Sequence, residues 1–143
     1  MSALKIGELA GRFNVPVETI RYYEQAGLLP KPARTAGNYR LYSKADADNL
    51  AFVLNCRVLD MRQEEIKALL ALRATPNNDC GDVNLLVDRH ITDITQRIDA
   101  LKSLLKELTT LRRACTENHA VRDCAILTRL QNVKGKKVRR QHE

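Results

Sequence analysis

A long stretch with a seven-residue apolar repeat, residues 80–115, constrains the fold of this chain most strongly. The stretch contains no proline, and its one glycine, Gly81, stands at its start. Such a repeat predicts a long helix that needs a partner helix. Two neighbouring lines of apolar residues make up the repeat: Val87, Ile94, Leu101 and Leu108, then Ile91, Ile98 and Leu105.

The order of these residues predicts an antiparallel pairing with a second copy of the chain. With a crossing near residues 97–98, Ile94 of one chain faces Leu101 of the other. The apolar line is complementary to its own reversal, as a twofold interface requires. We therefore expect a homodimer with a long antiparallel coiled coil, whose interface contains Val87, Ile94, Ile98, Leu101, Leu105 and Leu108.

Cysteines stand at both ends of this predicted helix. At 1.5 Å per residue the helix is roughly 50 Å long, so Cys80 and Cys115 of one chain cannot share a ligand. Antiparallel pairing instead brings Cys80 of one chain beside Cys115 of the other, twice per dimer. The sequence therefore predicts two thiolate sites across the dimer interface.

A polar loop after the long helix supplies a third sulfur. Cys124 follows Cys115 at the end of this loop and opens a short predicted helix over residues 124–130. Three thiolates select a soft cation over Mg²⁺ or Ca²⁺ and leave the site one ligand short for structural zinc. We expect Pb(II) or Hg(II) to suit the three sulfurs, with His119 as a possible extra ligand for Cd(II) or Zn(II).

A second interpretation of the cysteine pair stays open. Cys115 and Cys124 could instead form a redox switch through a disulfide. Cys56 lies among apolar residues of a predicted helix, and we interpret it as a small buried hydrophobe outside the metal site. Nearby cations are expected to lower the thiol pKa values at the site: Arg112, Arg113 and Arg122.

The first 75 residues predict a winged helix-turn-helix. Residues 5–13 and 17–25 each have an apolar helical face, and residues 14–16 form a break between them. The basic stretch that follows contains Gly37 and Asn38 between short β-capable segments, which predicts a small β-hairpin wing. The candidate DNA contacts are Val17, Thr19, Arg21, Tyr22, Tyr23, Arg34, Asn38, Tyr39 and Arg40.

Amphipathic helices over residues 46–59 and 63–72 complete this part, so the fold class is mainly α. We expect a DNA-binding domain over 1–75, a linker and dimerisation helix over 76–113, and a metal-binding loop, short helix and basic tail over 114–143. The net charge of +7 permits a polyanionic partner. No apolar run reaches membrane length and no signal peptide is evident, so we expect a cytoplasmic protein with reduced thiols.

The sequence does not indicate an enzyme. It contains no Gly-rich phosphate loop and no Cys-x-x-Cys motif. Paired carboxylates in an apolar setting are also absent from the pattern, and the three histidines have no evident nucleophile to serve.

Three sequence motifs resemble the MerR family of bacterial transcription regulators. They are residues 6–10 (IGELA), residues 19–24 (TIRYYE) followed by 27–29 (GLL), and residues 38–42 (NYRLY). The resemblance runs from residue 4 to about residue 73 and continues in the long helix. The residues around Cys80 and Cys124 resemble the lead- and cadmium-responsive branch, PbrR and CadR.

This resemblance implies a regulator of a metal-resistance promoter. Residues 17–24 would enter the major groove, while the wing holds the flanking backbone. The metal-bound dimer would bend and untwist double-stranded promoter DNA so that RNA polymerase can engage both promoter elements. The implied effector is Pb(II) or Cd(II), held by Cys80, Cys115 and Cys124; an Hg(II)-responsive regulator is the alternative, because that branch also has three cysteines.

Overall fold

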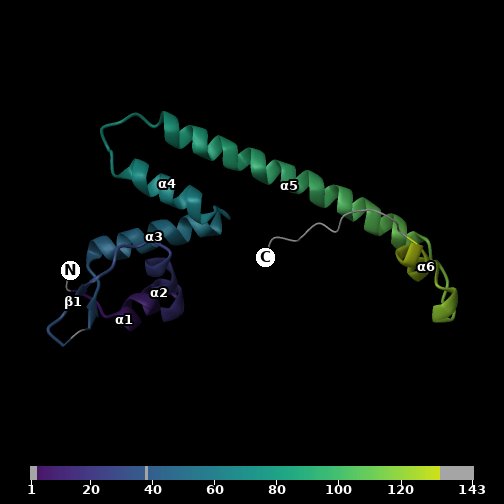
Figure 1. Cartoon of the computed structure of the whole chain (residues 1–143), viewed down its shortest axis with the longest axis horizontal. Helices are drawn as coiled ribbons and strands as arrows, with labels where there is room; N and C mark the ends of the chain where they lie inside the picture. Colours follow the sequence, from purple (N-terminus) through teal and green to yellow (C-terminus); the bar gives the residue numbers. More distant parts are fainter. Residues whose placement is uncertain (1–2, 38, 133–143) are drawn as a thin grey trace. The chain divides into compact units, whose positions relative to one another are not determined.

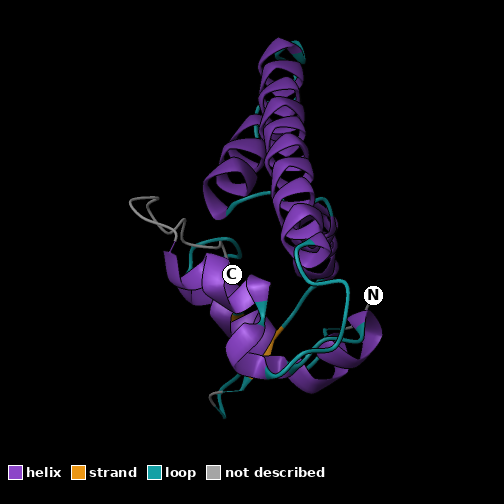
Figure 2. Ribbon diagram, turned by 90° about the vertical axis from the view of Figure 1, so that its right-hand side faces the viewer, coloured by secondary structure: helices purple, strands orange, loops and turns teal. Residues whose placement is uncertain are grey.

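The computed structural model describes residues 3–37 and 39–132, and helices dominate this part of the chain (Figures 1 and 2). Two compact units are present, Met1–His90 and Ile91–Glu143. The predicted mainly α class with one small hairpin is confirmed. The elements in order are α1 (Ile6–Phe13), α2 (Val17–Gln25), β1 (Ala33–Arg34), β2 (Arg40–Leu41), α3 (Lys44–Val58), α4 (Gln63–Arg73), α5 (Gly81–Arg113), the 3₁₀ helix η1 (Val121–Asp123) and α6 (Ala125–Asn132).

The turn between α1 and α2 forms for identifiable local reasons. Asn14 ends α1 in the left-handed conformation at φ 53°, which asparagine adopts more readily than most residues. Pro16 stands at the N-cap of α2, where its missing N–H costs nothing to the helix. Leu9 and Ile20 are buried on the facing sides of the two helices. The predicted helix-turn-helix is therefore present.

Helices α3 and α4 complete the core of the head, by which we mean α1 to α4 with the two strands. Ser43 caps α3: its hydroxyl accepts from the Asp46 N–H at 3.2 Å, and its own N–H donates to the Asp46 carboxylate at 2.8 Å. This cap starts α3 two residues before the predicted helix. The largest fully buried side chains are Leu9, Ile20, Leu28, Leu50, Val53 and Ile66.

Cys56 lies within this core. It is 6% exposed, and burial raises the pKa of its thiol. A buried thiol of this kind remains protonated and acts as a small apolar side chain. The interpretation of Cys56 as a buried hydrophobe is confirmed.

The wing is a two-stranded antiparallel hairpin. Its register pairs Ala33 with Leu41 and Arg34 with Arg40. An isolated bridge joins Leu4 to Tyr42, with two backbone hydrogen bonds of 2.8 Å. The beginning of the described chain is thereby fastened to the end of the wing.

Helix α5 has 33 residues, close to the predicted extent. In its first turns Val83 and Leu86 pack against the core of the head, and His90 is buried. Farther along, its apolar side chains are largely exposed in the single chain. None of the helices in the described residues is both long enough and apolar enough to cross a bilayer. The predicted basic tail lies outside these residues.

Candidate functional site

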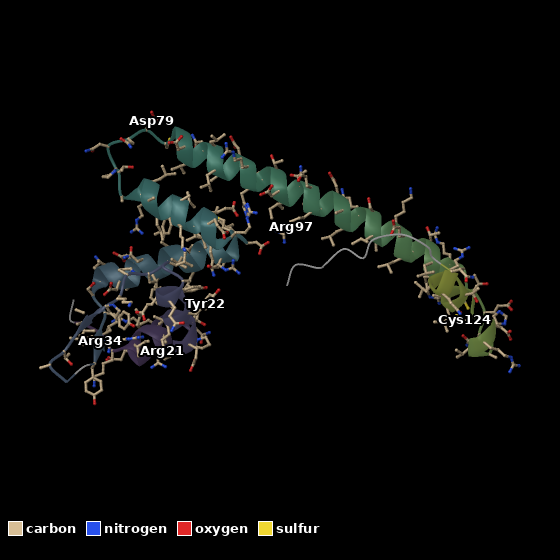
Figure 3. All side chains as sticks on the ribbon, in the orientation of Figure 1. Arg21, Tyr22, Arg34, Asp79, Arg97 and Cys124 are labelled. Atoms are coloured by element: carbon tan, nitrogen blue, oxygen red, sulfur yellow. The ribbon has the colours of Figure 1, made fainter. Side chains whose placement is uncertain are left out.

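A basic groove lies on the head between the start of α1, helix α2 and the wing. Its volume is about 690 Å³, and four cationic side chains line it together with Tyr39. Figure 3 shows Arg21 on α2 and Arg34 on the wing. Glu8 also lines the groove, so its cationic side chains outnumber its acidic ones four to one. An excess of positive charge around an open groove is suited to a phosphate backbone. The cations are Lys5, Arg21, Arg34 and Arg40.

The outer face of α2 carries further candidate DNA contacts. Tyr22 is 54% exposed, and its hydroxyl accepts a hydrogen bond from the Gln63 side chain. Thr19 is half-buried beside it, on the rim of a second cavity of about 400 Å³. On the wing, Tyr39 is 64% exposed and lies under the Lys5 ammonium at 5.5 Å. These side chains are available to a partner.

Tyr23 is more buried than the other predicted DNA contacts on α2. It is 8% exposed and belongs to the core of the head, because the helical period turns this position inward one turn after Ile20. It packs in the core of the head, and a small part of its side chain also lines the second cavity. Val17 is half-buried and packs against the same core. Asn38 lies outside the described residues.

A buried network that the sequence analysis missed connects α2 to the wing. Glu24 accepts hydrogen bonds from Arg40 Nη1 and from the Tyr42 hydroxyl, each at 2.8 Å. Burial, and then the hydrogen bond to this carboxylate, raise the pKa of Tyr42 to about 12. The signal in the sequence was present: Glu24 follows Ile20 by four residues and so lies on the same inward face.

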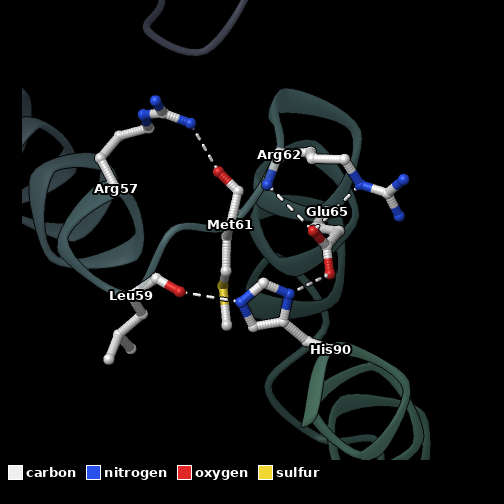
Figure 4. A network of polar contacts seen from close by, with 6 residues as sticks. All are labelled: Arg57, Leu59, Met61, Arg62, Glu65 and His90. Carbon is white, nitrogen blue, oxygen red and sulfur yellow. Dashed lines mark hydrogen bonds and ion pairs between the residues drawn. The ribbon is translucent and has the colours of Figure 1, made fainter. Parts of the chain in front are cut away.

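A second missed network holds α4 against the first turns of α5 (Figure 4). His90 Nε2 donates to the Leu59 carbonyl at 2.8 Å, while Nδ1 lies 3.0 Å from Glu65 Oε2 without an aligned hydrogen bond. Burial alone would raise the pKa of Glu65, but the Arg62 N–H, His90 and the Arg62 side chain together lower it.

The predicted dimer interface forms an apolar stripe on α5. Ile98 is 46% exposed, and Leu101, Leu105 and Leu108 are each more than 60% exposed in the single chain. Ile94 is half-buried, and Val87 is 36% exposed. An apolar stripe of this length on a helix calls for a covering partner.

The structure brings Cys115 and Cys124 together. Cys115 follows the end of α5, and Cys124 stands immediately before α6, within hydrogen-bonding reach of Cys115. The N–H of Leu127 does most to lower the pKa of the Cys124 thiol; desolvation opposes this, and the Ile126 N–H and Cys115 contribute further lowering. A helix N-terminus stabilises a thiolate in this way.

The arginines do not have the role predicted for them at Cys124. Its pKa is lowered by backbone N–H groups and by Cys115, because the sulfur occupies the capping position of α6. Arg112 instead donates to the Cys115 carbonyl at 2.7 Å and holds the end of α5. The exposed Arg122 pairs weakly with Asp123 at 3.8 Å.

The other two predicted ligands are Cys80, at the opposite end of α5, and His119, in the loop between the two cysteines. Cys80 is exposed directly before α5, with its sulfur 3.7 Å from the Asn84 side-chain amide. The 33 residues of α5 separate it from Cys115. His119 is exposed on the loop between Cys115 and Cys124, and its place as a further ligand stays a prediction.

Known proteins resemble this chain over most of its length. The family model described as "MerR family regulatory protein" matches residues 5–42, and "MerR, DNA binding" matches residues 47–111. The HTH-type transcriptional regulator ZntR homolog of Haemophilus influenzae is 43% identical over 80% of this chain and 85% of its own. The mercuric resistance operon regulatory protein of Bacillus cereus is 37% identical, over 88% and 96%.

A solved structure agrees with these matches. The transcription regulator PbrR691 from Ralstonia metallidurans CH34, in complex with lead(II), is 44% identical with a TM-score of 0.81, over 89% of this chain and 98% of its own. The matching families and relatives are transcription regulators and not enzymes. Together with the winged head and its basic groove, these matches show that the chain belongs to the MerR family of DNA-binding transcription regulators.

Proposed function

We propose that this regulator senses a soft heavy metal and controls a metal-resistance promoter. The observation that carries the proposal is the pair of adjacent sulfurs, Cys115 and Cys124, one of which caps a helix N-terminus. Two adjacent thiols, one of which has a lowered pKa, provide two of the ligands that a thiophilic cation needs. The similarity to the mercuric resistance operon regulatory protein and to lead-bound PbrR691 supports the same class of effector.

We assign the third ligand to Cys80 of the partner chain in an antiparallel homodimer. A helix of 33 residues is about 50 Å long, so a chain cannot bring its own Cys80 to its own Cys115. The exposed apolar stripe on α5 supports the pairing that would solve this problem. Each dimer would then hold two sites of three thiolates.

Pb(II) or Cd(II) is our preferred effector, and Hg(II) is the alternative. Three sulfurs without a fixed fourth ligand suit a large, soft cation better than a tetrahedral structural zinc. Zn(II) stays among the metals to be tested, because His119 could supply a fourth ligand to it.

The regulatory step acts on promoter DNA. The head binds the duplex through its basic groove and α2, and the metal adds positive charge and fixed thiolate bonds at the junction of the two chains. A metal changes the balance between two dimer states only by the difference in its affinity for them. We propose that the favoured state distorts the promoter so that RNA polymerase engages it.

A competition titration tests the choice of metal. Reduced protein is titrated with Pb(II), Cd(II), Zn(II) and Hg(II) while the sulfur-to-metal ultraviolet bands are followed, and Cys80→Ser is compared with the control Cys56→Ala. We expect tight Pb(II) binding that is lost in Cys80→Ser and kept in Cys56→Ala. Zinc binding that equals or exceeds lead binding would contradict the assignment, as would a Cys80→Ser variant that binds lead normally.

The adjacency of Cys115 and Cys124 also favours a second candidate, a thiol-redox sensor. The two sulfurs could form a disulfide on oxidation, whereas bound metal would protect them. Free thiols are counted after mild oxidation with and without Pb(II). Rapid loss of two thiols, together with DNA binding that responds to oxidation and not to metal, would favour the redox function.

A further inference from the structure

Glu24 is a buried carboxylate at the inner face of α2. Its side chain is 5% exposed, and both of its oxygens are engaged by the wing, at Arg40 and at Tyr42. A buried charge persists only where partners compensate for its lost hydration. The raised pKa of Tyr42, about 12, keeps its hydroxyl protonated as a donor to this carboxylate. Glu24 therefore joins the second helix of the helix-turn-helix to strand β2.

The wing places two cations directly opposite each other. Its register pairs Arg34 with Arg40, and like charges at directly opposed positions of a hairpin repel. Glu24 pairs with Arg40 at 2.8 Å, and its negative charge offsets this repulsion. Arg40 remains 29% exposed, and it lines the basic groove together with Arg21 and Arg34. Arg40 thus donates through Nη1 to Glu24, and its side chain also forms part of the wall of the groove.

We propose that Glu24 is a positioning residue for DNA binding, holding the Arg40 guanidinium at the edge of the basic groove where it meets a phosphate. A guanidinium that is already held in place loses less side-chain freedom when it binds. The inference rests on the DNA-binding role of the head and does not depend on the metal site. Glu24 itself does not touch the DNA.

The charge of Glu24 makes the proposal testable by the sign of an effect. Glu24→Gln keeps the size of the side chain but removes one negative charge from a DNA-binding surface. Long-range electrostatics alone would then strengthen binding to a polyanion. Loss of the Arg40 anchor would weaken binding instead. The two explanations predict opposite changes.

The experiment measures binding of the reduced, metal-free full chain to a labelled mixed-sequence duplex of about 30 base pairs, where phosphate contacts dominate. Affinity is recorded at several KCl concentrations. We expect Glu24→Gln to weaken binding about three- to tenfold and to lower the salt slope by about one per head. The matched control is Glu18→Gln, an equal charge change at an exposed position of the same helix, which we expect to leave binding unchanged or stronger.

Two further variants separate positioning from folding. Tyr42→Phe removes the other hydrogen bond to Glu24 and leaves Arg40 in place. We expect it to lower the melting temperature while affinity and salt slope stay at the wild-type values. In Arg40→Gln, Glu24 no longer has a guanidinium to position. Adding Glu24→Gln to this variant should therefore cause little further loss of affinity, and this non-additivity measures the coupling between the two residues.

The outcomes distinguish this inference from the function of the head. Wild-type protein that fails to bind DNA would overturn the DNA-binding role itself. Wild-type binding with tighter binding by Glu24→Gln would overturn the positioning role alone. An equal loss of affinity in Tyr42→Phe, or additive losses in the double variant, would likewise show that Glu24 acts through the fold and not through Arg40.

Discussion

Cys56 and Cys124 show how far the surroundings of a residue decide its chemistry. Burial in the core raises the pKa of the Cys56 thiol, whereas the N–H groups at the start of α6 lower the pKa of Cys124. The first cysteine is inert packing, and the second is prepared to act as a ligand or nucleophile. In the sequence, the only sign of this difference is that Cys56 has apolar neighbours.

This contrast predicts selective alkylation in the metal-free protein. The thiolate is the reactive form, so a lowered pKa places more of Cys124 in that form at neutral pH. We expect iodoacetamide to modify Cys124 well before Cys56, with the rate at Cys124 levelling off at a lower pH than for a free thiol. Peptide mass mapping over a pH series measures both rates, and comparable rates at the two cysteines would refute the assignment.

At the scale of elements, the sequence predicted the helices well where their apolar residues recur with a clear helical period. The predicted ranges of the six α-helices in the described residues agree with the observed ones to within about two residues, because the apolar period of the longer helices is a local property of the sequence. The polar networks around Glu24 and His90 were missed because their partners lie far away in the chain. The burial of Tyr23 was not predicted, because an amphipathic aromatic side chain fits both a core and a DNA interface.

The contact of α5 with α4 gives a prediction at this scale. His90→Ala would leave the Leu59 carbonyl without its donor and Glu65 without its imidazole neighbour. Unpaired buried polar groups cost about 1–3 kcal/mol, so we expect the free energy of unfolding to fall by roughly this amount. Urea denaturation followed by circular dichroism measures the change.

The control for this variant is His119→Ala, the same substitution at an exposed loop position. Surface changes of this kind usually alter stability by less than about 0.5 kcal/mol. If both variants have the same stability as the wild type, the His90 network does not fasten α5 to the head.

At the scale of the whole molecule, the account depends on a partner chain. The exposed stripe on α5 leads us to predict that Leu101→Glu separates the dimer, because the new carboxylate would face Ile94 of the partner in the apolar interface. Leu101 is 63% exposed in the single chain, so the substitution should not disturb the fold of the head. Sedimentation velocity measures the mass of the particle.

Ser103→Glu is the matched control, since it introduces the same charge outside the predicted interface on the same helix. We expect this variant to remain dimeric while Leu101→Glu sediments as a monomer over the same concentration range. A dimeric Leu101→Glu would place the interface elsewhere on the molecule.

The most direct test of the central claim uses a mixed dimer. One chain carries Cys80→Ser, and the other, with a different affinity tag, carries both Cys115→Ser and Cys124→Ser. If each site combines Cys80 of one chain with Cys115 and Cys124 of the other, neither homodimer has a complete site, but the purified heterodimer has one. We predict that the heterodimer binds one Pb(II) tightly with the thiolate absorption band of the wild type. Failure of the heterodimer to regain tight binding, while wild-type protein binds two Pb(II) per dimer, would contradict a site shared between subunits.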